Sequence, residues 1–140
     1  MILYLNLQYV MAMHRVLIER YGGLDGFRDP GLLESALAQS QQSVFGEDLF
    51  PNIPSRAAAY AYYLSENQPF IDGNKRIATA SAITFLRLNH YDLKASQEEV
   101  YQVIMELANK RPSRESFVDW FLKYSIKKQK KIKEELTSYR

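Results

Sequence analysis

Hydrophobic residues recur every three or four positions through most of the chain, which is the spacing of one helix face. The first predicted helix runs from about Asn6 to Tyr21 and ends at the glycine pair that follows. A second helix begins at Asp29-Pro30, because aspartate is a good N-cap and proline fits the first helical position. The buried positions predicted for these two helices are Val10, Met13, Leu17 and Ile18, then Leu32, Leu33, Ala36 and Leu37.

The helical spacing then fails, and a stretch follows that mixes β-forming residues with glycine and proline. We expect a loop or a short hairpin there, over residues 43–54. A third helix follows from Ser55 to about Glu66. Pro69 ends it, because proline disfavours helical geometry in the residue before it, and Gln68 is therefore placed at a helix exit.

Three more helices complete the prediction. The longest, from Asn74 to Asn89, is rich in alanine and suits a central position packed on several sides. Ser96 to Glu99 has the spacing of a capping box and opens the next helix, and Ser113 can cap the last. The pattern predicts an all-α bundle with one irregular excursion. The apolar positions of the last two helices are Val100, Val103, Ile104 and Leu107, then Phe117, Trp120, Phe121 and Tyr124.

The composition fits a single globular domain. The chain has 140 residues, of which 46% are hydrophobic and 24% charged, and this length supports one core. We assign residues 1–125 to the domain and residues 126–140 to a lysine-rich helical extension. The absence of cysteine excludes disulfides and thiolate chemistry and fits the reducing cytoplasm.

Charge and hydropathy argue against two other classes of protein. The apolar N-terminus is interrupted by charges from His14 onwards, so we expect neither a signal peptide nor a membrane span. The net charge is only +2, and the excess lies in the lysines near the C-terminus. We therefore do not expect nucleic acid as a partner.

The start of the longest predicted helix holds residue types that handle phosphate. Asp72 and Gly73 stand before it, and Asn74, Lys75 and Arg76 follow. Backbone N–H groups at a helix start attract anions, glycine lets a phosphate approach, and the two cations add positive charge. Asp72 is able to hold Mg²⁺, which proteins usually bind through one or two carboxylates together with substrate phosphates. The same residues also suit a plain helix start with a capping aspartate and solvated cations.

This segment resembles the signature of the Fic/Doc (death-on-curing) family, which reads His-x-Phe-x-(Asp or Glu)-Gly-Asn-(Gly or Lys)-Arg. The matching positions are Phe70, Asp72, Gly73, Asn74 and Arg76, and Lys75 is the variant seen in Doc-type toxins. A second stretch of similarity lies upstream, at Arg20 to Leu24 and Asp29 to Gly31. The resemblance covers residues from about 6 to 125 and implies the Fic fold.

The resemblance implies a role for each residue of the loop. Asp72 would bind the metal, and Gly73 and Asn74 would form the anion hole for the nucleotide phosphates. Lys75 and Arg76 would bind phosphate as well and pair with the charge that grows in the transition state. The cofactors implied are ATP and Mg²⁺. The irregular stretch before the third helix would be the flap that docks the target polypeptide as an added strand.

Two positions depart from the family pattern, and the first concerns the reaction. Members that transfer AMP have a second arginine three places after the first, and here that place is Thr79. Together with Lys75, this resembles a Doc-like toxin of a type II toxin–antitoxin system. Such a toxin would move a phosphoryl group from ATP to a hydroxyl of a translation protein, with elongation factor Tu as the family precedent. Transfer of AMP to a protein hydroxyl is the alternative.

The second departure is Gln68, which stands where the family has its catalytic histidine. That histidine is the general base that takes the proton of the attacking hydroxyl, and a glutamine amide cannot accept it. We therefore expect the chain as written to be a weak or inactive enzyme, and a non-catalytic module that binds nucleotide or antitoxin is the alternative. An inactivating substitution in a toxic enzyme and a natural variant explain Gln68 equally well.

Inhibition is expected to come from a separate antitoxin protein. Family members are often restrained by a helix with a Ser/Thr-x-x-x-Glu-(Gly or Asn) motif, supplied internally or by an antitoxin. The nearest match, Ser43 to Glu47, is followed by Asp48 and lies in the irregular stretch, so we do not accept it. We expect a disordered segment of the antitoxin to fold into a groove on this protein.

The remaining candidates are better explained by packing. His14 and His90 lie far from the loop in sequence, and we expect both to pack in the core or on the surface. Tyr60, Tyr62 and Tyr63 are expected on a core-facing helix, because base stacking normally comes with a basic groove.

Overall fold

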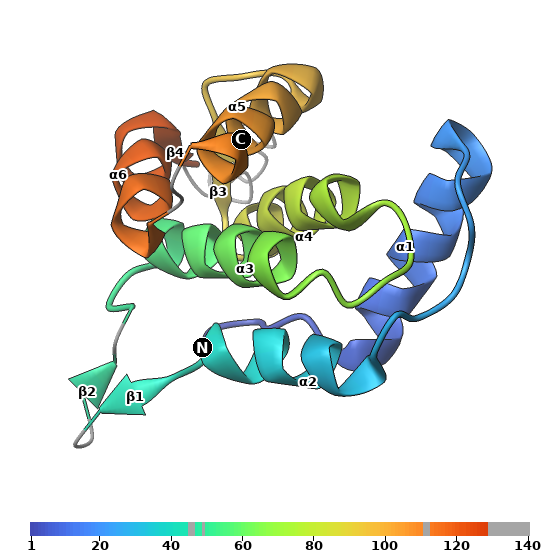
Figure 1. The fold of residues 1–140 in the computed structure, drawn as a ribbon. Helices are drawn as coiled ribbons and strands as arrows, with labels where there is room; N and C mark the ends of the chain where they lie inside the picture. Colours follow the sequence, from blue (N-terminus) through green and yellow to red (C-terminus); the bar gives the residue numbers. More distant parts are fainter. Residues whose placement is uncertain (45–46, 49, 111–112, 129–140) are drawn as a thin grey trace, which may run out of the picture.

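A computed structural model describes residues 1–44, 47–48, 50–110 and 113–128. This part of the chain forms six α-helices and four short strands (Figure 1). The all-α prediction is confirmed. In chain order the elements are α1 (Leu7–Tyr21), α2 (Pro30–Gln39), β1 (Ser43–Val44), β2 (Glu47–Asp48), α3 (Ile53–Asn67), α4 (Asn74–Leu88), β3 (Tyr91–Leu93), α5 (Gln97–Asn109), α6 (Arg114–Tyr124) and β4 (Ser125–Lys127).

Helices α3 and α4 form the centre of the molecule, as predicted for α4, and the other helices pack around this pair (Figure 1). Helices α2 and α6 pack on α3, whereas α1 and α5 pack on α4. Both central helices are rich in buried alanine, whose small side chain allows close approach. The fully buried alanines are Ala57, Ala58, Ala59 and Ala61 in α3 and Ala78 and Ala82 in α4. The tyrosines of α3 face the core as predicted, since Tyr60 is buried and Tyr62 and Tyr63 pack partly against it.

The helix starts follow the polar caps in the sequence. The side chains of Asp29, Ser96 and Ser113 cap α2, α5 and α6 as predicted. Helix α3 begins at Ile53 and not at Ser55, because Asn52 is its N-cap. The Asn52 side chain accepts from the Ser55 N–H, and the Ser55 hydroxyl accepts in return from the Asn52 N–H.

Two short hairpins lie outside the helices. Strands β1 and β2 pair antiparallel within the stretch predicted as a loop or hairpin, and they extend away from the helices (Figure 1). Strands β3 and β4 form a second antiparallel pair, which the sequence pattern does not predict.

Strand β4 lies where we expected the lysine-rich helical extension to begin. The helix prediction is wrong at Ile126 and Lys127, because pairing with Asp92 and Tyr91 holds these residues extended. Residues 129–140 lie outside the described part of the chain, so the division of the chain at residue 125 stays a prediction.

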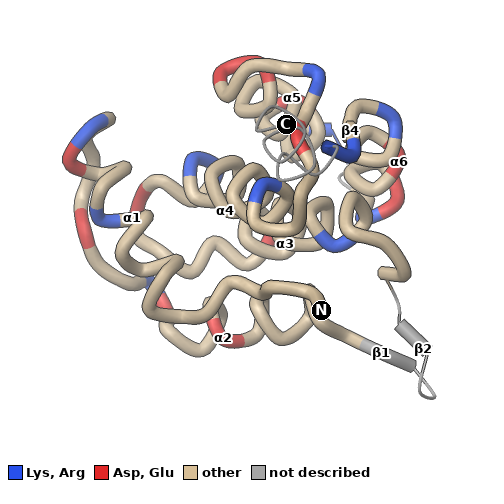
Figure 2. The backbone as a smooth tube through the Cα atoms, turned by 180° about the vertical axis from the view of Figure 1, so that it is seen from behind, with Lys and Arg blue, Asp and Glu red and all other residues tan. Residues whose placement is uncertain are grey.

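Charged residues of both signs are spread over the described surface (Figure 2). Lys and Arg occur on α1, α4, α6 and β4, and Asp and Glu lie among them on α1, α2, α5 and α6. In this part of the chain, no helix has both the length and the hydropathy needed to cross a membrane.

Candidate active-site loop

The loop of interest links the two central helices. Gln68 ends α3 with a left-handed backbone, at φ 47°, and Gly73 precedes α4 in the same region, at φ 79°. Glycine adopts this conformation without strain, whereas it is uncommon for other residues. The predicted helix exit at Gln68 is confirmed.

A segment far away in sequence holds the loop in place. The N–H groups of Arg28 and Asp29 both donate to the Pro69 carbonyl, at 2.8 and 3.0 Å. Beside them, Phe27 and Phe70 form an antiparallel bridge. The two separate stretches of family resemblance are therefore one structural unit, because the upstream stretch is the backbone partner of the loop.

The Arg28 side chain closes the end of α3. Its Nε donates to the Gln68 carbonyl and its Nη2 to the Asn67 carbonyl, each at 2.7 Å. The last carbonyls of a helix lack intrahelical partners, and the helix dipole favours a cation beside them. Arg28 therefore fixes the backbone of Gln68, a role that the sequence analysis does not assign to it.

Asp72 has one carboxylate oxygen engaged and lies against a glycine. Its Oδ2 accepts a hydrogen bond from the Leu24 N–H at 2.7 Å. A Cβ added at Gly23 would lie 3.1 Å from the Asp72 Cβ, so this approach requires glycine. The backbone of residues 23–24 thus fixes the direction of the carboxylate.

The donor set of the loop fits a metal ion that arrives with a nucleotide. Mg²⁺ is commonly bound by one or two carboxylates, with substrate phosphates and water as the other ligands, and Asp72 supplies one such carboxylate. Among the described residues, no group of three or more His, Cys, Asp or Glu side chains could hold a metal by itself. A single carboxylate of this kind fits an ion whose other ligands come from substrate phosphates and water.

The Asn74 side chain ties the loop to itself. Its Oδ1 accepts from the Phe70 N–H and its Nδ2 donates to the Phe70 carbonyl, both at 3.0 Å. The amide oxygen and one of the two amide hydrogens are thus used inside the loop, which fixes the orientation of the side chain. Helix α4 has no side-chain cap and no acidic residue in its first turn, which leaves its positive end open to an anion.

The two cations of the motif have different surroundings. Within the described part of the chain, no carboxylate pairs with the Lys75 ammonium group. Arg76 lies between the rings of Tyr21 and Tyr101, at 4.0 and 3.6 Å from their centroids, and its Nη1 is 3.0 Å from the Glu98 carboxylate. The hydrogen bond from Arg76 holds the pKa of Glu98 below its ordinary value. Among the described residues, Arg76 therefore has a counter-ion and Lys75 has none.

A cavity of about 290 Å³ opens over the loop. This volume is at the lower end of the range of ligand pockets, roughly 300–1,000 Å³. The structure brings all the predicted site residues to this cavity, and none of the described residues lining it is a histidine. Two lining residues of α5, Tyr101 and Met105, carry no signal in the sequence because only packing brings α5 beside the loop. The lining consists of Gln68, Ile71, Asp72, Gly73, Asn74, Lys75, Arg76, Tyr101 and Met105.

The two histidines lie in different places. His90 is exposed after the end of α4. His14 is 1% exposed, so its packing prediction is confirmed, but it packs directly beneath the loop. Its Nε2 is 2.7 Å from the Asp72 carbonyl oxygen, and its ring stacks on Phe70 with centroids 3.6 Å apart. The sequence carried a signal for the burial of His14, which lies one turn after Val10 on the buried face of α1, but none for its contact with the loop.

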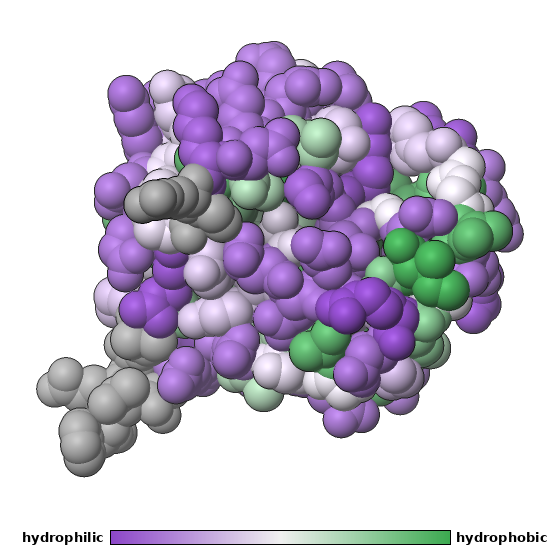
Figure 3. Space-filling view, viewed as in Figure 1, coloured by the Kyte–Doolittle hydropathy of each residue, from purple (hydrophilic) through white to green (hydrophobic). Residues whose placement is uncertain are grey.

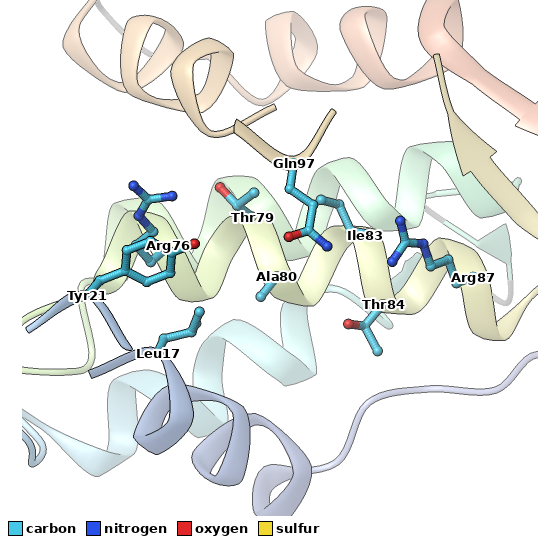
Figure 4. Close-up of a pocket in the computed structure, with 9 residues that line it drawn as sticks. All are labelled: Leu17, Tyr21, Arg76, Thr79, Ala80, Ile83, Thr84, Arg87 and Gln97. Atoms are coloured by element: carbon cyan, nitrogen blue, oxygen red, sulfur yellow. The ribbon is translucent and has the colours of Figure 1, made fainter. Parts of the chain in front are cut away.

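Arg76 also lines a second hollow, a groove between α1 and α4 (Figure 4). Thr79 is buried there and its hydroxyl donates to the Lys75 carbonyl at 2.8 Å, so this position offers no charge. The α1–α4 groove is lined by Leu17, Tyr21, Arg76, Thr79, Ala80, Ile83, Thr84, Arg87 and Gln97. It shares Leu17 and Ala80 with an adjoining apolar hollow, whose other lining residues are Tyr9, Ala12, Met13 and Val16.

This fold and this loop belong to a known family. The model of the Fic/DOC family matches residues 4–86, more than half of the chain, so the protein is a member of that family. The resemblance read from the motif is thereby confirmed.

Two relatives have names that concern function. The chain is 44% identical over 75 residues to a protein of Mycolicibacterium smegmatis named Toxin Doc, and the match covers 54% of this chain and 58% of that protein. It is 36% identical over 89 residues to a protein of Escherichia phage P1 named Protein kinase doc, covering 64% of this chain and 70% of that one. The chain thus spans less than two thirds of the first relative.

Proposed function

We propose that this protein is a Doc-like toxin of a type II toxin–antitoxin system, built to move the γ-phosphoryl group of ATP to a hydroxyl of a translation protein. The names of the two relatives, one a toxin and one a protein kinase, support this class of function. The observation that carries the proposal is the start of α4, which has no side-chain cap and where Asp72 and Lys75, a cation that pairs with no described carboxylate, line one cavity.

The loop would hold the nucleotide phosphates chiefly through its backbone and one side chain. The N–H groups of Gly73 and Asn74 stand at the positive end of α4, and Lys75 adds a charge that no described carboxylate neutralises. Arg76 would join them by giving up or sharing its contact with Glu98. Two positive centres then face the charge that develops on the transferred group.

Asp72 would hold Mg²⁺ through the carboxylate oxygen that the Leu24 N–H leaves open. When bound, the ion neutralises phosphate charge. Gly23 and Leu24 keep the carboxylate in place, and Asn74 keeps the loop closed around it.

The missing element is a proton acceptor. In the transfer, the hydroxyl oxygen bonds to the γ-phosphorus while the bond from that phosphorus to its bridging oxygen breaks, and ADP leaves. The hydroxyl proton must go to a base, and the Gln68 amide cannot take it. Loss of a general base typically slows a reaction by about 10²–10⁴, so we infer that this chain is weak or inactive while it keeps its nucleotide site.

Two alternatives to this function can be distinguished from it by experiment. Lys75 and Thr79 together favour phosphoryl transfer, whereas AMP transfer is the alternative reaction for this fold. Gln68 itself favours a second function, a non-catalytic module that binds nucleotide or antitoxin.

The antitoxin is proposed to bind in the α1–α4 groove. Figure 3 shows hydrophobic residues gathered at the surface on the side of the molecule where α1 lies. Among the residues that line the groove and the adjoining hollow, Val16 is 59% and Tyr21 50% exposed. The guanidinium groups of Arg76 and Arg87 lie along the groove (Figure 4). An amphipathic antitoxin segment with acidic residues beside its apolar face is complementary to this surface.

The target polypeptide is proposed to dock on the β1–β2 hairpin as an added strand. A two-stranded hairpin has open edges, and an edge strand can pair with an extended peptide. Elongation factor Tu is the first target to test.

Calorimetric titration with ATP and Mg²⁺ tests the site. We expect the unaltered Gln68 protein to bind, and the double variant Asp72→Ala with Arg76→Ala to bind at least about tenfold more weakly, which is about 1.4 kcal/mol. The matched control is Asp119→Ala with Arg15→Ala, which removes one charge of each sign at exposed positions away from the loop. An affinity for ATP with Mg²⁺ that the loop substitutions leave unchanged would contradict the assignment of the nucleotide site to this loop.

Gln68→His tests the reaction. Histidine tolerates a left-handed backbone better than most residues, and it would restore the base and raise transfer to a target hydroxyl by about 10²–10⁴. Mass spectrometry should find an added phosphate, and this variant should arrest growth when expressed without an antitoxin. Gln68→Asn is the control, because it changes the side chain without adding a base. An added AMP would refute phosphoryl transfer, and no product from any variant would favour the binding module.

A further inference from the structure

His14 is the only described histidine beneath the loop, and its contacts define its hydrogen-bonding state. A carbonyl oxygen can only accept, so the 2.7 Å contact means that Nε2 carries a hydrogen and donates to the Asp72 carbonyl. On the far side of the ring, Nδ1 is 3.7 Å from the Asp25 carboxylate. The ring is parallel to that of Phe70, within 8°, and is therefore held in one orientation.

The direction of the Asp72 carbonyl decides where the next N–H points. In a trans peptide the C=O of one residue and the N–H of the following residue point in opposite directions. Because His14 draws the Asp72 carbonyl towards α1, the Gly73 N–H points away from α1. The cavity over the loop is lined by α5 and by no residue of α1. The hydrogen bond from His14 on one side of the peptide thus turns the Gly73 N–H towards the cavity on the other side.

The space around Gly73 leaves little room for another arrangement. A Cβ on Gly73 would lie 3.4 Å from His14 Nε2 and 3.3 Å from Ile18 Cδ1, so α1 packs closely against this peptide. The Gly73 N–H has no acceptor among the described residues, which leaves it open to an anion.

We propose that His14 is a positioning residue for phosphate binding. By donating to the Asp72 carbonyl it fixes the peptide between Asp72 and Gly73, so that the Gly73 N–H and the Asp72 carboxylate both face the nucleotide. The proposal rests on the proposed nucleotide site and adds a residue of α1 to it.

Two substitutions separate the hydrogen bond from the packing. His14→Phe keeps an aromatic ring on Phe70 but removes the donor, whereas His14→Gln places an amide N–H near the position of Nε2. We expect His14→Phe to weaken binding of ATP with Mg²⁺ by about tenfold, which corresponds to one hydrogen bond of about 1.4 kcal/mol, and His14→Gln to stay within about threefold. His90→Gln is the control at the other histidine and should leave the affinity unchanged.

A second measurement keeps this test independent of nucleotide binding. In ¹H–¹⁵N NMR spectra of the unliganded protein, the Gly73 amide signal should move in His14→Phe and return near its original position in His14→Gln. The unaltered protein should show a protonated Nε2 at His14 in long-range spectra, a result that does not depend on any variant folding.

The outcomes are distinct. Three results would each overturn the role of His14. The first is an equal affinity of the unaltered protein, His14→Phe and His14→Gln for ATP with Mg²⁺. The others are a Gly73 amide signal that does not move in His14→Phe and an Nε2 without a hydrogen in the unaltered protein. A loss of affinity in both variants that follows their loss of thermal stability overturns it as well, because it indicates packing alone. If the unaltered protein fails to bind ATP while the Gly73 signal behaves as expected, the proposed function fails and the positioning of the peptide stands.

Discussion

Arg76 is the residue whose surroundings depart most from the role implied by the motif. The motif makes it a phosphate ligand, yet its guanidinium lies between two tyrosine rings and pairs with Glu98 at 3.0 Å. A glutamate is ionised at neutral pH, and the hydrogen bond from Arg76 lowers the pKa of Glu98 further, so a charged carboxylate occupies the guanidinium that the motif assigns to phosphate. A nucleotide must therefore displace or share an existing ion pair.

Replacing Glu98 tests this competition. We expect Glu98→Gln to bind ATP with Mg²⁺ about two- to fivefold more tightly, because the phosphate no longer has to compete with the Glu98 carboxylate for Arg76, and exposed ion pairs of this kind are weak. Titration calorimetry measures the change. Glu106→Gln is the matched control, since it removes the same charge from the same helix away from Arg76. An equal gain in both variants would show a general charge effect and contradict the competition.

At the scale of elements, the site is built from three pieces that are distant in sequence. The α3–α4 connection carries the motif, the segment from Gly22 to Asp29 supplies its backbone partners, and α1 lies beneath it. Glycines make the second piece possible, because Gly22 and Gly23 have φ 84° and φ 109° and Gly23 touches Asp72. The precise fit of this segment decides where the carboxylate points.

Two alanine substitutions separate backbone strain from contact with Asp72. Gly22→Ala and Gly23→Ala both place a side chain at positive φ, so each should lower the free energy of unfolding by about 1–3 kcal/mol in chemical denaturation. Only the Cβ of Gly23→Ala meets Asp72, whereas that of Gly22→Ala has nothing within 4 Å. We therefore expect only Gly23→Ala to weaken binding of ATP with Mg²⁺ by about tenfold or more. Similar affinities in the two variants would argue against Asp72 as a ligand.

At the scale of the whole molecule, the α3–α4 pair joins the loop to a single core. Phe85 is fully buried in α4 and its ring lies 4.9 Å from that of Tyr60 in α3. The N-terminal segment is part of the same core, because the Leu5 N–H donates to the Tyr60 hydroxyl at 3.2 Å. Burial raises the pKa of Tyr60, so this hydroxyl stays protonated well beyond neutral pH.

A core substitution should therefore change stability without changing the site. We expect Phe85→Leu to lower the free energy of unfolding by about 1–2 kcal/mol in one cooperative transition, because it leaves a small cavity. The affinity for ATP with Mg²⁺ should stay within about twofold, since no hydrogen bond of the loop involves Phe85. Val16→Ala, at a position 59% exposed on α1, is the control and should change stability by no more than about 0.5 kcal/mol. Two separate unfolding transitions in Phe85→Leu would contradict a single core.

The candidate site could be predicted in part from the sequence. Gln68, Asp72, Gly73, Asn74, Lys75 and Arg76 line one cavity, as the continuous motif implies. The surroundings could not be predicted, because Arg28, Glu98 and His14 reach the loop from other elements. Even the Asn74 side chain could not be assigned from the motif alone, since its two hydrogen bonds depend on how the loop closes onto Phe70.

The sequence by itself determined the helices and the family. Helix starts, helix ends and the exit at Gln68 follow from caps, proline and spacing, and these act between residues no more than about four apart. The tertiary structure decided which of the two motif cations pairs with a described carboxylate, what holds Asp72, and that residues 91–93 and 125–127 pair as strands. These features join residues far apart in the chain. They form only where α1, α5 and the Gly22–Asp29 segment pack against α4 and its loop, because this packing brings the partners within hydrogen-bonding distance.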